Sequence, residues 1–208
     1  MDVGDSWRMR AIFTCIIRRR RQIAALLACV ALLAGVTGWA QAAQPPATIL
    51  LIRHAEKLTD GRIDLSPVGF ERAKRIPKLF GGVGAAAPHN LPRPDFLFAT
   101  HQSKKSNRPV ETIAPLSEAL KLPISAEIED DDFAALAKEL LSGKYAGMVV
   151  LVAWHHGKIP AFARALGAMP PYDPWPETQF DRVWRIDYRD GKAALTDLPQ
   201  GLMAGDSK

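Results

Sequence analysis

Two arginines and two histidines stand at positions where they could do chemistry together. Arg53 and His54 end one apolar run, His156 follows another, and Arg108 stands where a helix should begin. Guanidinium groups stay charged and match phosphate oxygens with paired hydrogen bonds, and a helix N-terminus adds backbone N–H donors. A neutral imidazole can attack phosphorus while a second imidazole hydrogen-bonds a non-bridging oxygen. These side chains suit a phosphoryl group, and no metal is required.

Two short apolar runs should bring these side chains to one place. Residues 49–52 and 147–153 are rich in branched residues and too short for buried helices, so each predicts a strand covered on both faces. In open α/β sheets ligands bind beyond the carboxyl ends of the strands, which is where both histidines would stand. The arginine at the helix start would reach the same edge of the sheet.

The rest of the pattern alternates strands with helices. Ser66-Pro67 is typical of a helix start, and apolar residues then recur at helical spacing to about Phe80. The alternation over 180–188 is typical of an antiparallel edge strand, with Asp190-Gly191 as a hairpin turn. Further helices are expected over 109–120, 131–141 and 159–166, and further strands over 95–99, 123–126 and 193–198. The pattern predicts an α/β fold, a three-layer α/β/α sandwich with a mostly parallel central sheet.

The first 43 residues have the pattern of an export signal. A basic stretch ends in four arginines at 18–21, residues 23–40 carry no charge, and Ala40-Gln41-Ala42 is a small-x-small cleavage site. We therefore expect a signal peptide in residues 1–43, a catalytic domain in residues 44–208, and a periplasmic or secreted location. Alternatively, residues 23–40 remain as a membrane anchor, because their length is near the lower limit for spanning a bilayer.

Removing this leader changes what the composition means. The whole chain carries a net charge of +5, but the first 43 residues hold six Arg and two Asp, which leaves a net charge of +1. The basic character therefore gives no support for a nucleic-acid partner. Cys15 and Cys29 also lie in the leader, so the mature chain has neither a disulfide nor a cysteine nucleophile.

Four short motifs follow one another, each at an expected strand end or helix start. They are Arg53-His54-Ala55-Glu56, Leu65-Ser66-Pro67 with Gly69 and Arg72-Ala73, Arg108 with Thr112, and His156-Gly157. Together they resemble the motifs of the histidine phosphatase superfamily, over about residues 49–166. The resemblance implies the phosphoglycerate mutase-like fold and His54 as the nucleophile that forms a phosphohistidine. It also implies that Arg53, Arg108 and His156 bind the phosphoryl group.

The chain departs from this family where a proton donor is needed. The resemblance calls for a Glu or Asp that protonates the leaving oxygen, and Glu127 lies in about the right region. The acidic run behind it, 129–132, is at least as well explained as a solvated helix cap. We expect Glu56 to orient the pocket and His155 to be only a sequence neighbour of His156.

The resulting hypothesis is a metal-independent phosphatase that needs no cofactor. Its partner would be a phosphorylated small molecule, a phosphomonoester or a related phosphoanhydride; a mutase is the other activity that the resemblance leaves open. The alternative is an exported phosphate-binding module with little or no catalysis, since the proton donor is not evident. A zinc hydrolase lacks ligands, because the mature chain has no cysteine and no His-Glu-x-x-His motif.

Overall fold

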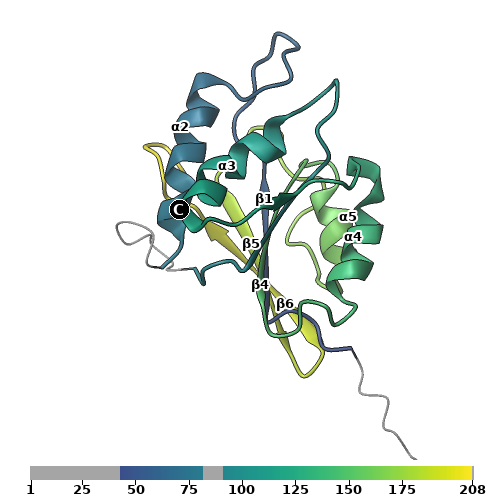
Figure 1. Ribbon diagram of the computed structural model, residues 1–208. Helices are drawn as coiled ribbons and strands as arrows, with labels where there is room; N and C mark the ends of the chain where they lie inside the picture. Colours follow the sequence, from purple (N-terminus) through teal and green to yellow (C-terminus); the bar gives the residue numbers. More distant parts are fainter. Residues whose placement is uncertain (1–42, 82–90, 208) are drawn as a thin grey trace, which may run out of the picture. The chain divides into compact units, whose positions relative to one another are not determined.

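The computed structural model describes residues 43–81 and 91–207 (Figure 1). Residues 1–42, which hold the predicted signal peptide or anchor, lie outside the described residues, as does part of the loop before the second strand. No helix within the two described ranges is long and apolar enough to span a membrane.

One six-stranded sheet runs through the described residues, with the strand order β3-β2-β4-β1-β5-β6. Its strands are β1 (Thr48–Arg53), β2 (Phe96–Ala99), β3 (Ile124–Ser125), β4 (Val149–Trp154), β5 (Arg182–Arg189) and β6 (Lys192–Pro199). The first four are parallel to one another, whereas β5 and β6 run antiparallel to their neighbours. The predicted mostly parallel sheet is confirmed.

The predicted edge position of residues 180–188 is wrong. β5 pairs with β1 on one side and with β6 on the other, so β6 is the strand at this edge. The alternation instead reflects two differently covered faces of β5. Trp184 and Ile186 pack in the core, whereas Arg185 and Asp187 form an ion pair on the other face. The hairpin turn is confirmed, with positive φ angles at Asp190 and Gly191.

The helices also follow the predicted pattern. They are α2 (Pro67–Arg75), α3 (Arg108–Leu120), α4 (Phe133–Leu140) and α5 (Ile159–Ala165), with 3₁₀ turns η1 (Ile76–Leu79) and η2 (Asp130–Asp132). Ser66 caps α2, since its Oγ accepts a hydrogen bond of 3.1 Å from the N–H of Gly69. The α-helix ends at Arg75 rather than near Phe80 because Pro77 has no N–H to donate, and the chain continues as η1.

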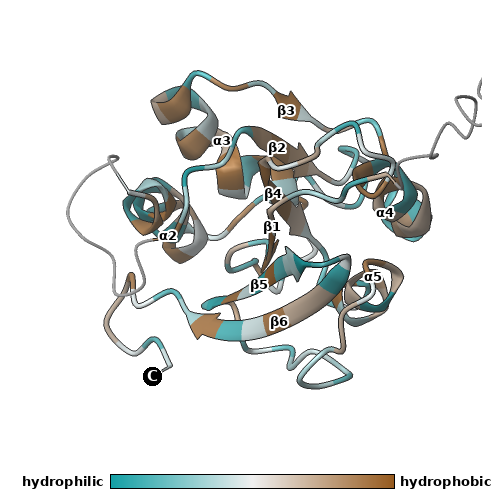
Figure 2. Ribbon diagram, turned by 90° about the horizontal axis from the view of Figure 1, so that it is seen from below, coloured by the Kyte–Doolittle hydropathy of each residue, from teal (hydrophilic) through white to brown (hydrophobic). Residues whose placement is uncertain are grey.

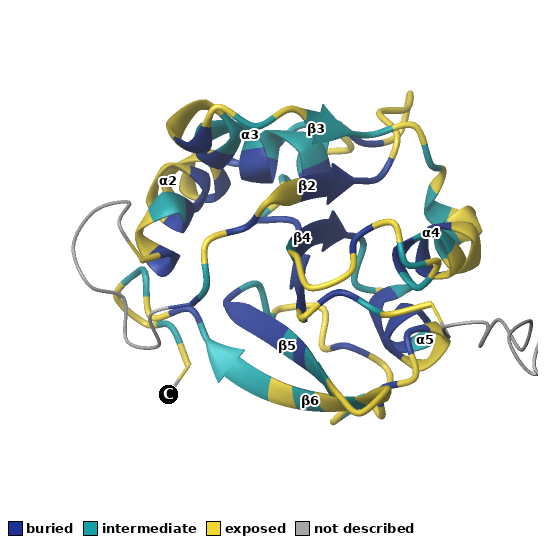
Figure 3. Cartoon of the chain, turned by 60° about the horizontal axis from the view of Figure 1, so that its bottom comes forward, coloured by how far each residue is buried: buried dark blue, intermediate teal, exposed yellow. Residues whose placement is uncertain are grey.

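Helices cover both faces of the sheet, which confirms the three layers. Figure 1 shows α2 and α3 on one side and α4 and α5 on the other. Successive side chains of β1 pack in two different cores. Ile49 and Leu51 pack in the cluster that includes residues of α4 and α5, and Leu50 and Ile52 pack in the cluster that includes residues of α3. The central strands β1 and β4 are accordingly mostly apolar and almost entirely buried (Figures 2 and 3).

Candidate active site

Arg53 is the last residue of β1, and its guanidinium is almost completely buried. Nη1 donates hydrogen bonds to the backbone oxygens of Pro176 (3.1 Å), Glu177 (2.6 Å) and Gln179 (3.1 Å). The group also lies 3.8 Å from the centroid of the Phe180 ring, a cation–π contact. Burial lowers the pKa of Arg53 to about 10, so the side chain stays charged at neutral pH. One nitrogen thus holds the 176–179 loop.

His54 follows directly and is also buried. Its Nδ1 lies 2.7 Å from the backbone oxygen of Ala55, so Nδ1–H is the donor and the lone pair is on Nε2. Burial, followed by the charges of Arg53 and Arg108, lowers the pKa of His54 to about 2. The ring is therefore neutral at physiological pH and its Nε2 can act as a nucleophile.

His155, not His156, is the imidazole that faces His54. The two rings are edge to face, with centroids 5.4 Å apart and planes at 68°. The register explains this contact: Arg53 pairs with Trp154 in the parallel ladder, so the residues that follow, His54 and His155, leave the sheet side by side. The sequence predicted His155 to be only a sequence neighbour of His156, because the register between two separate strands cannot be inferred from the residues of either strand.

His156 lies on the Arg53 side of the site and is half-buried. Burial, with smaller contributions from the charges of Arg53 and Lys57, lowers its pKa to about 4. Its Nδ1 is buried and has no hydrogen-bond partner in the part of the chain that the structure describes. This ring is therefore also neutral at physiological pH and can exchange a hydrogen bond with a ligand.

Arg108 is the first residue of α3, as the sequence predicts. Its backbone N–H donates to Ser106 Oγ (3.3 Å) and its Nη1 donates to the backbone oxygen of Arg62 (3.2 Å). Burial lowers the pKa of Arg108, because the charge is partly removed from water. One turn later Thr112 Oγ1 donates to the Arg108 oxygen (2.7 Å) and accepts from the N–H of Ala55 (2.8 Å). Thr112 thereby ties the start of α3 to the end of β1.

Five buried polar side-chain atoms lack a hydrogen-bond partner within the described ranges, and all belong to this end of the sheet. They are Arg53 Nε and Nη2, Thr100 Oγ1, Arg108 Nε and His156 Nδ1. An unsatisfied buried polar group costs about 1–3 kcal/mol, so such groups are few in folded proteins and seldom gather without a reason. Most of these atoms are N–H donors on cations, which an anion with several oxygens would satisfy.

A pocket of about 500 Å³ lies on the Arg108 and His155 side of these groups, and neither Arg53, His54 nor His156 lines it. It is lined by residues 103–106, Arg108, residues 129–131 and His155. Asp130 therefore lies in the pocket, with its Oδ1 3.0 Å from Nδ1 of His155. Glu127, the candidate proton donor, is exposed and does not line this pocket. The acidic run is not a side-chain cap either, because Asp132 at the N-cap of α4 makes no side-chain capping bond.

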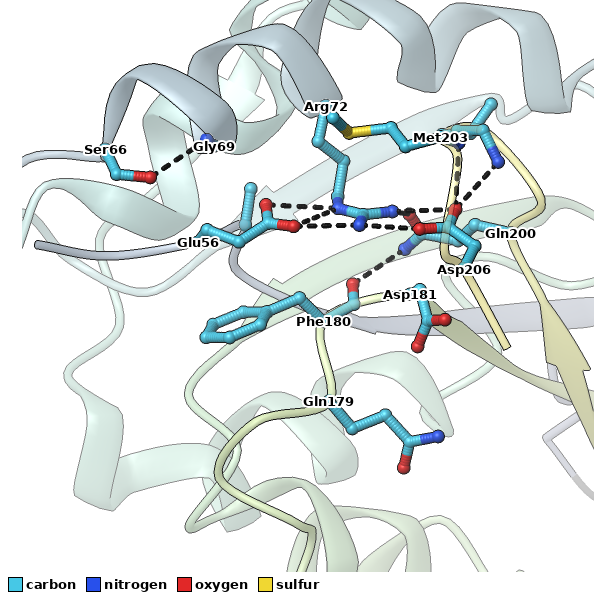
Figure 4. A network of polar contacts seen from close by, with 12 residues as sticks. Glu56, Ser66, Gly69, Arg72, Gln179, Phe180, Asp181, Gln200, Met203 and Asp206 are labelled. Carbon is cyan, nitrogen blue, oxygen red and sulfur yellow. Dashed lines mark hydrogen bonds and ion pairs between the residues drawn. The ribbon is translucent and has the colours of Figure 1, made fainter.

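Glu56 is paired with Arg72 of α2 (Figure 4). Arg72 Nη2 lies 2.8 Å from Glu56 Oε1 and 2.8 Å from Asp206 Oδ1, and Nη1 donates to Gln200 (3.1 Å). The backbone oxygen of Glu56 accepts from the N–H of Ser66 (2.8 Å). These contacts fix the segment after His54, which agrees with an orienting role for Glu56.

The larger pocket beside this network is not the candidate site. It has a volume of about 670 Å³ and is lined by Glu56, Arg72, Phe180 and residues 203–207, among others, but by none of the histidines. Arg72 is also fully engaged by carboxylates and an amide, so it has no donor left for an anion. In the described residues no three His, Cys, Asp or Glu side chains gather as metal ligands would.

The fold has counterparts among solved structures. No family model matches the chain, and no curated protein matches it in sequence. A phosphoserine phosphatase mutant from Entamoeba histolytica in complex with phosphoserine shares 13% identity at a TM-score of 0.51, covering 75% of this chain and 98% of its own. Phosphoserine phosphatase from the same organism with 3-phosphoglyceric acid shares 15% at a TM-score of 0.50, covering 75% and 99%.

A third solved structure, Bacillus stearothermophilus YhfR, shares 16% identity at a TM-score of 0.51 and covers 76% of this chain and 98% of its own. At such identities a likeness shows the fold and not the activity. The matched structures agree with the architecture that the four motifs implied. The described part of the chain thus has the phosphoglycerate mutase-like α/β fold of the histidine phosphatase superfamily.

Proposed function

We propose that the chain is a phosphatase that hydrolyses phosphomonoesters, or related phosphoanhydrides, through a phosphohistidine on His54. One observation carries this proposal: Arg53 and Arg108, which keep unpartnered, buried N–H donors, lie close enough to His54 to lower its pKa, and the Nε2 of this neutral imidazole carries the lone pair. A phosphoryl group supplies acceptor oxygens for those donors and an electrophilic phosphorus for that nitrogen.

The reaction has two steps of the same kind. In the first, Nε2 of His54 attacks phosphorus and the bond to the leaving oxygen breaks. In the second, water attacks the phosphohistidine and the P–N bond breaks, which frees His54 and inorganic phosphate. Arg53 and Arg108 stabilise the negative charge on the equatorial oxygens in both steps, because their guanidiniums are fixed before the substrate binds.

The second imidazole of the site is better assigned to His155 than to His156. His155 faces His54, whereas His156 presents its free Nδ1 near Arg53. We therefore propose that His155 acts beside the reacting phosphorus and that His156 binds a phosphoryl oxygen together with Arg53. Replacing each by Asn tests this division, which predicts the larger loss of kcat for His155→Asn and mainly a higher KM for His156→Asn.

Two further parts of the proposal rest on the sequence. The leader pattern supports export to the periplasm or beyond, or attachment to a membrane if residues 23–40 are retained. The alternative function is a phosphate-binding module of the same fold. Such a module would bind phosphate through the donors of Arg53 and Arg108 but would not hydrolyse a phosphoester. The exposed position of Glu127 is the observation in its favour.

The test is turnover of an aryl phosphate and of a panel of natural phosphoesters by the full chain, with a chelator present. His54→Ala is the informative variant. His101→Ala is its matched control, because His101 is exposed and lies in the loop after β2. Turnover that survives chelation and His101→Ala but disappears in His54→Ala supports the proposal. Phosphate binding without turnover of any ester would favour the binding module, and turnover by His54→Ala would refute the mechanism.

A further inference from the structure

The proposed reaction needs a proton for the leaving oxygen, and Glu127 is exposed and does not line the pocket beside Arg108. A chain of three hydrogen-bonded side chains lies instead in the pocket beside Arg108. Asp130 Oδ1 is 3.0 Å from His155 Nδ1, and His155 Nε2 is 3.1 Å from Ser106 Oγ. These residues come from η2, from the end of β4 and from the loop before α3, so the fold brings three separate segments together.

The backbone around Asp130 is fixed by contacts that do not involve its carboxylate. Trp154 Nε1 donates to the backbone oxygen of Asp130 (3.3 Å), and Lys158 pairs with Asp131. Upstream, the N–H of His101 donates to the backbone oxygen of Ile128 (2.8 Å). The turn is therefore tied to β4, to the start of α5 and to the loop after β2, and the carboxylate of Asp130 is held against His155.

Ser106 is buried and its Oγ is already an acceptor. It accepts a hydrogen bond from the backbone N–H of Arg108 (3.3 Å), and it lies 3.1 Å from Nε2 of His155. When Nε2–H of His155 is the second donor to Ser106 Oγ, the hydroxyl hydrogen of Ser106 can be donated to a ligand. Ser106 lines the same pocket as Arg108 and His155.

We propose that Asp130, His155 and Ser106 form a proton relay to the leaving oxygen, an inference that rests on the proposed function. As the P–O bond breaks, Ser106 gives its hydroxyl proton to the leaving oxygen and takes the Nε2 proton of His155, whose imidazolium becomes neutral. In the second step the attacking water loses a proton along the same path, which restores the imidazolium and leaves its hydroxyl on phosphorus. Asp130 is a positioning residue: it orients His155 and stabilises its positive charge.

The relay predicts a dependence on the leaving group that a structural role would not produce. A p-nitrophenolate leaves without a proton, whereas the alkoxide of an alkyl phosphate does not. General acid catalysis is worth about 10²–10⁴-fold, so Asp130→Asn and Ser106→Ala should each lower kcat/KM for an alkyl phosphate by about 100-fold or more. For p-nitrophenyl phosphate kcat/KM should change by less than about threefold, because it reports only the steps up to phosphohistidine formation.

Asp132→Asn is the matched control, since Asp132 lies two residues away in the same turn, is exposed and makes no capping bond. It should leave both substrates unaffected. The experiment measures kcat/KM of the full chain for p-nitrophenyl phosphate and glycerol 3-phosphate, with a thermal melt of each variant to confirm folding. The split between the two substrates in both relay variants supports the relay.

Three results would overturn it. Equal losses on both substrates would assign Asp130 and Ser106 a structural role, with the phosphatase itself intact. A parent that hydrolyses aryl but no alkyl phosphates would show that no such acid operates. A parent inactive on every ester would refute the proposed function and the relay with it, so the two failures are distinguishable.

Discussion

Arg72→Met should destabilise the protein severely, because the Arg72 guanidinium is the cation shared by two carboxylates. The Arg72 and Asp206 side chains are only 6% and 5% exposed, and Glu56 is 20% exposed. Methionine fills a similar volume but leaves both carboxylates facing each other without a counter-ion. Removing one partner of a buried ion pair costs about 3–5 kcal/mol of unfolding free energy. For a domain of this size that corresponds to a fall in Tm of about 6–20 °C.

Lys74→Met is the control, because Lys74 on the same helix pairs with Glu71 at the same distance of 2.8 Å but in water. An exposed pair contributes about 0–1 kcal/mol, so this variant should be nearly as stable as the parent. Urea unfolding followed by circular dichroism measures both changes. If Arg72→Met loses no more free energy than Lys74→Met, the reasoning about burial is refuted.

The pH dependence of this pair provides an independent check. Burial, the largest single effect, would raise the pKa of Asp206. The hydrogen bonds and charge of Arg72, together with the backbone N–H groups of Met203 and Leu202, outweigh burial and lower the pKa below its usual value. A carboxyl whose pKa is lowered on folding stabilises the protein above its unfolded pKa of about 3.9, and this stabilisation is lost as the pH falls through the folded value. The stability difference between the parent and Arg72→Met should therefore shrink in acid, and a difference that grows there would contradict the argument.

Three further predictions concern the site. Arg108→Ala should leave Tm unchanged within error but raise KM about 10- to 100-fold, because the substrate loses one hydrogen bond with a charged group. An unchanged KM in steady-state kinetics would place Arg108 outside the site. Thr112→Val should cost about 1–3 kcal/mol in urea unfolding, because the buried N–H of Ala55 loses its acceptor; an unaltered midpoint would contradict this. Folding lowers the pKa values of His54 and His156 to about 2 and about 4, so unfolding takes up protons below about pH 6.5, and the free energy of unfolding decreases as the pH decreases there. His54→Asn should reduce the slope of the unfolding free energy against pH by up to about 1.4 kcal/mol per pH unit. An equal slope in the parent and the variant would argue against a neutral buried ring.

The positions of the main elements could be predicted because local signals coincide with them. The apolar run at 49–52 is a strand because its side chains alternate between two cores, and Ser66-Pro67 begins a helix because the Ser66 hydroxyl caps it. The earlier end of α2 could have been predicted from Pro77, since a proline cannot donate the next helical hydrogen bond. The edge assignment of β5 failed because alternation reports how the faces are covered and not which strands lie alongside.

The site was predicted less completely because it depends on contacts between distant segments. Arg53, His54 and Arg108 could be chosen as candidates from their expected places at a strand end and a helix start, and the structure has them at those places. The pairing of His54 with His155 depends on the register of β1 and β4, which no local pattern determines. Asp130 was interpreted as part of a solvated cap, because its contact with His155 joins residues 25 positions apart in the chain.

The central claim is that His54 becomes phosphorylated during turnover. The most direct measurement is mass spectrometry of the full chain, quenched in alkali during turnover of p-nitrophenyl phosphate, with the modified residue located in the digest. The account predicts one phosphoryl group on His54 in the parent and in His101→Ala, and none in His54→Ala. Turnover in the parent with no phosphoryl group on His54, or with the group on another residue, would contradict it.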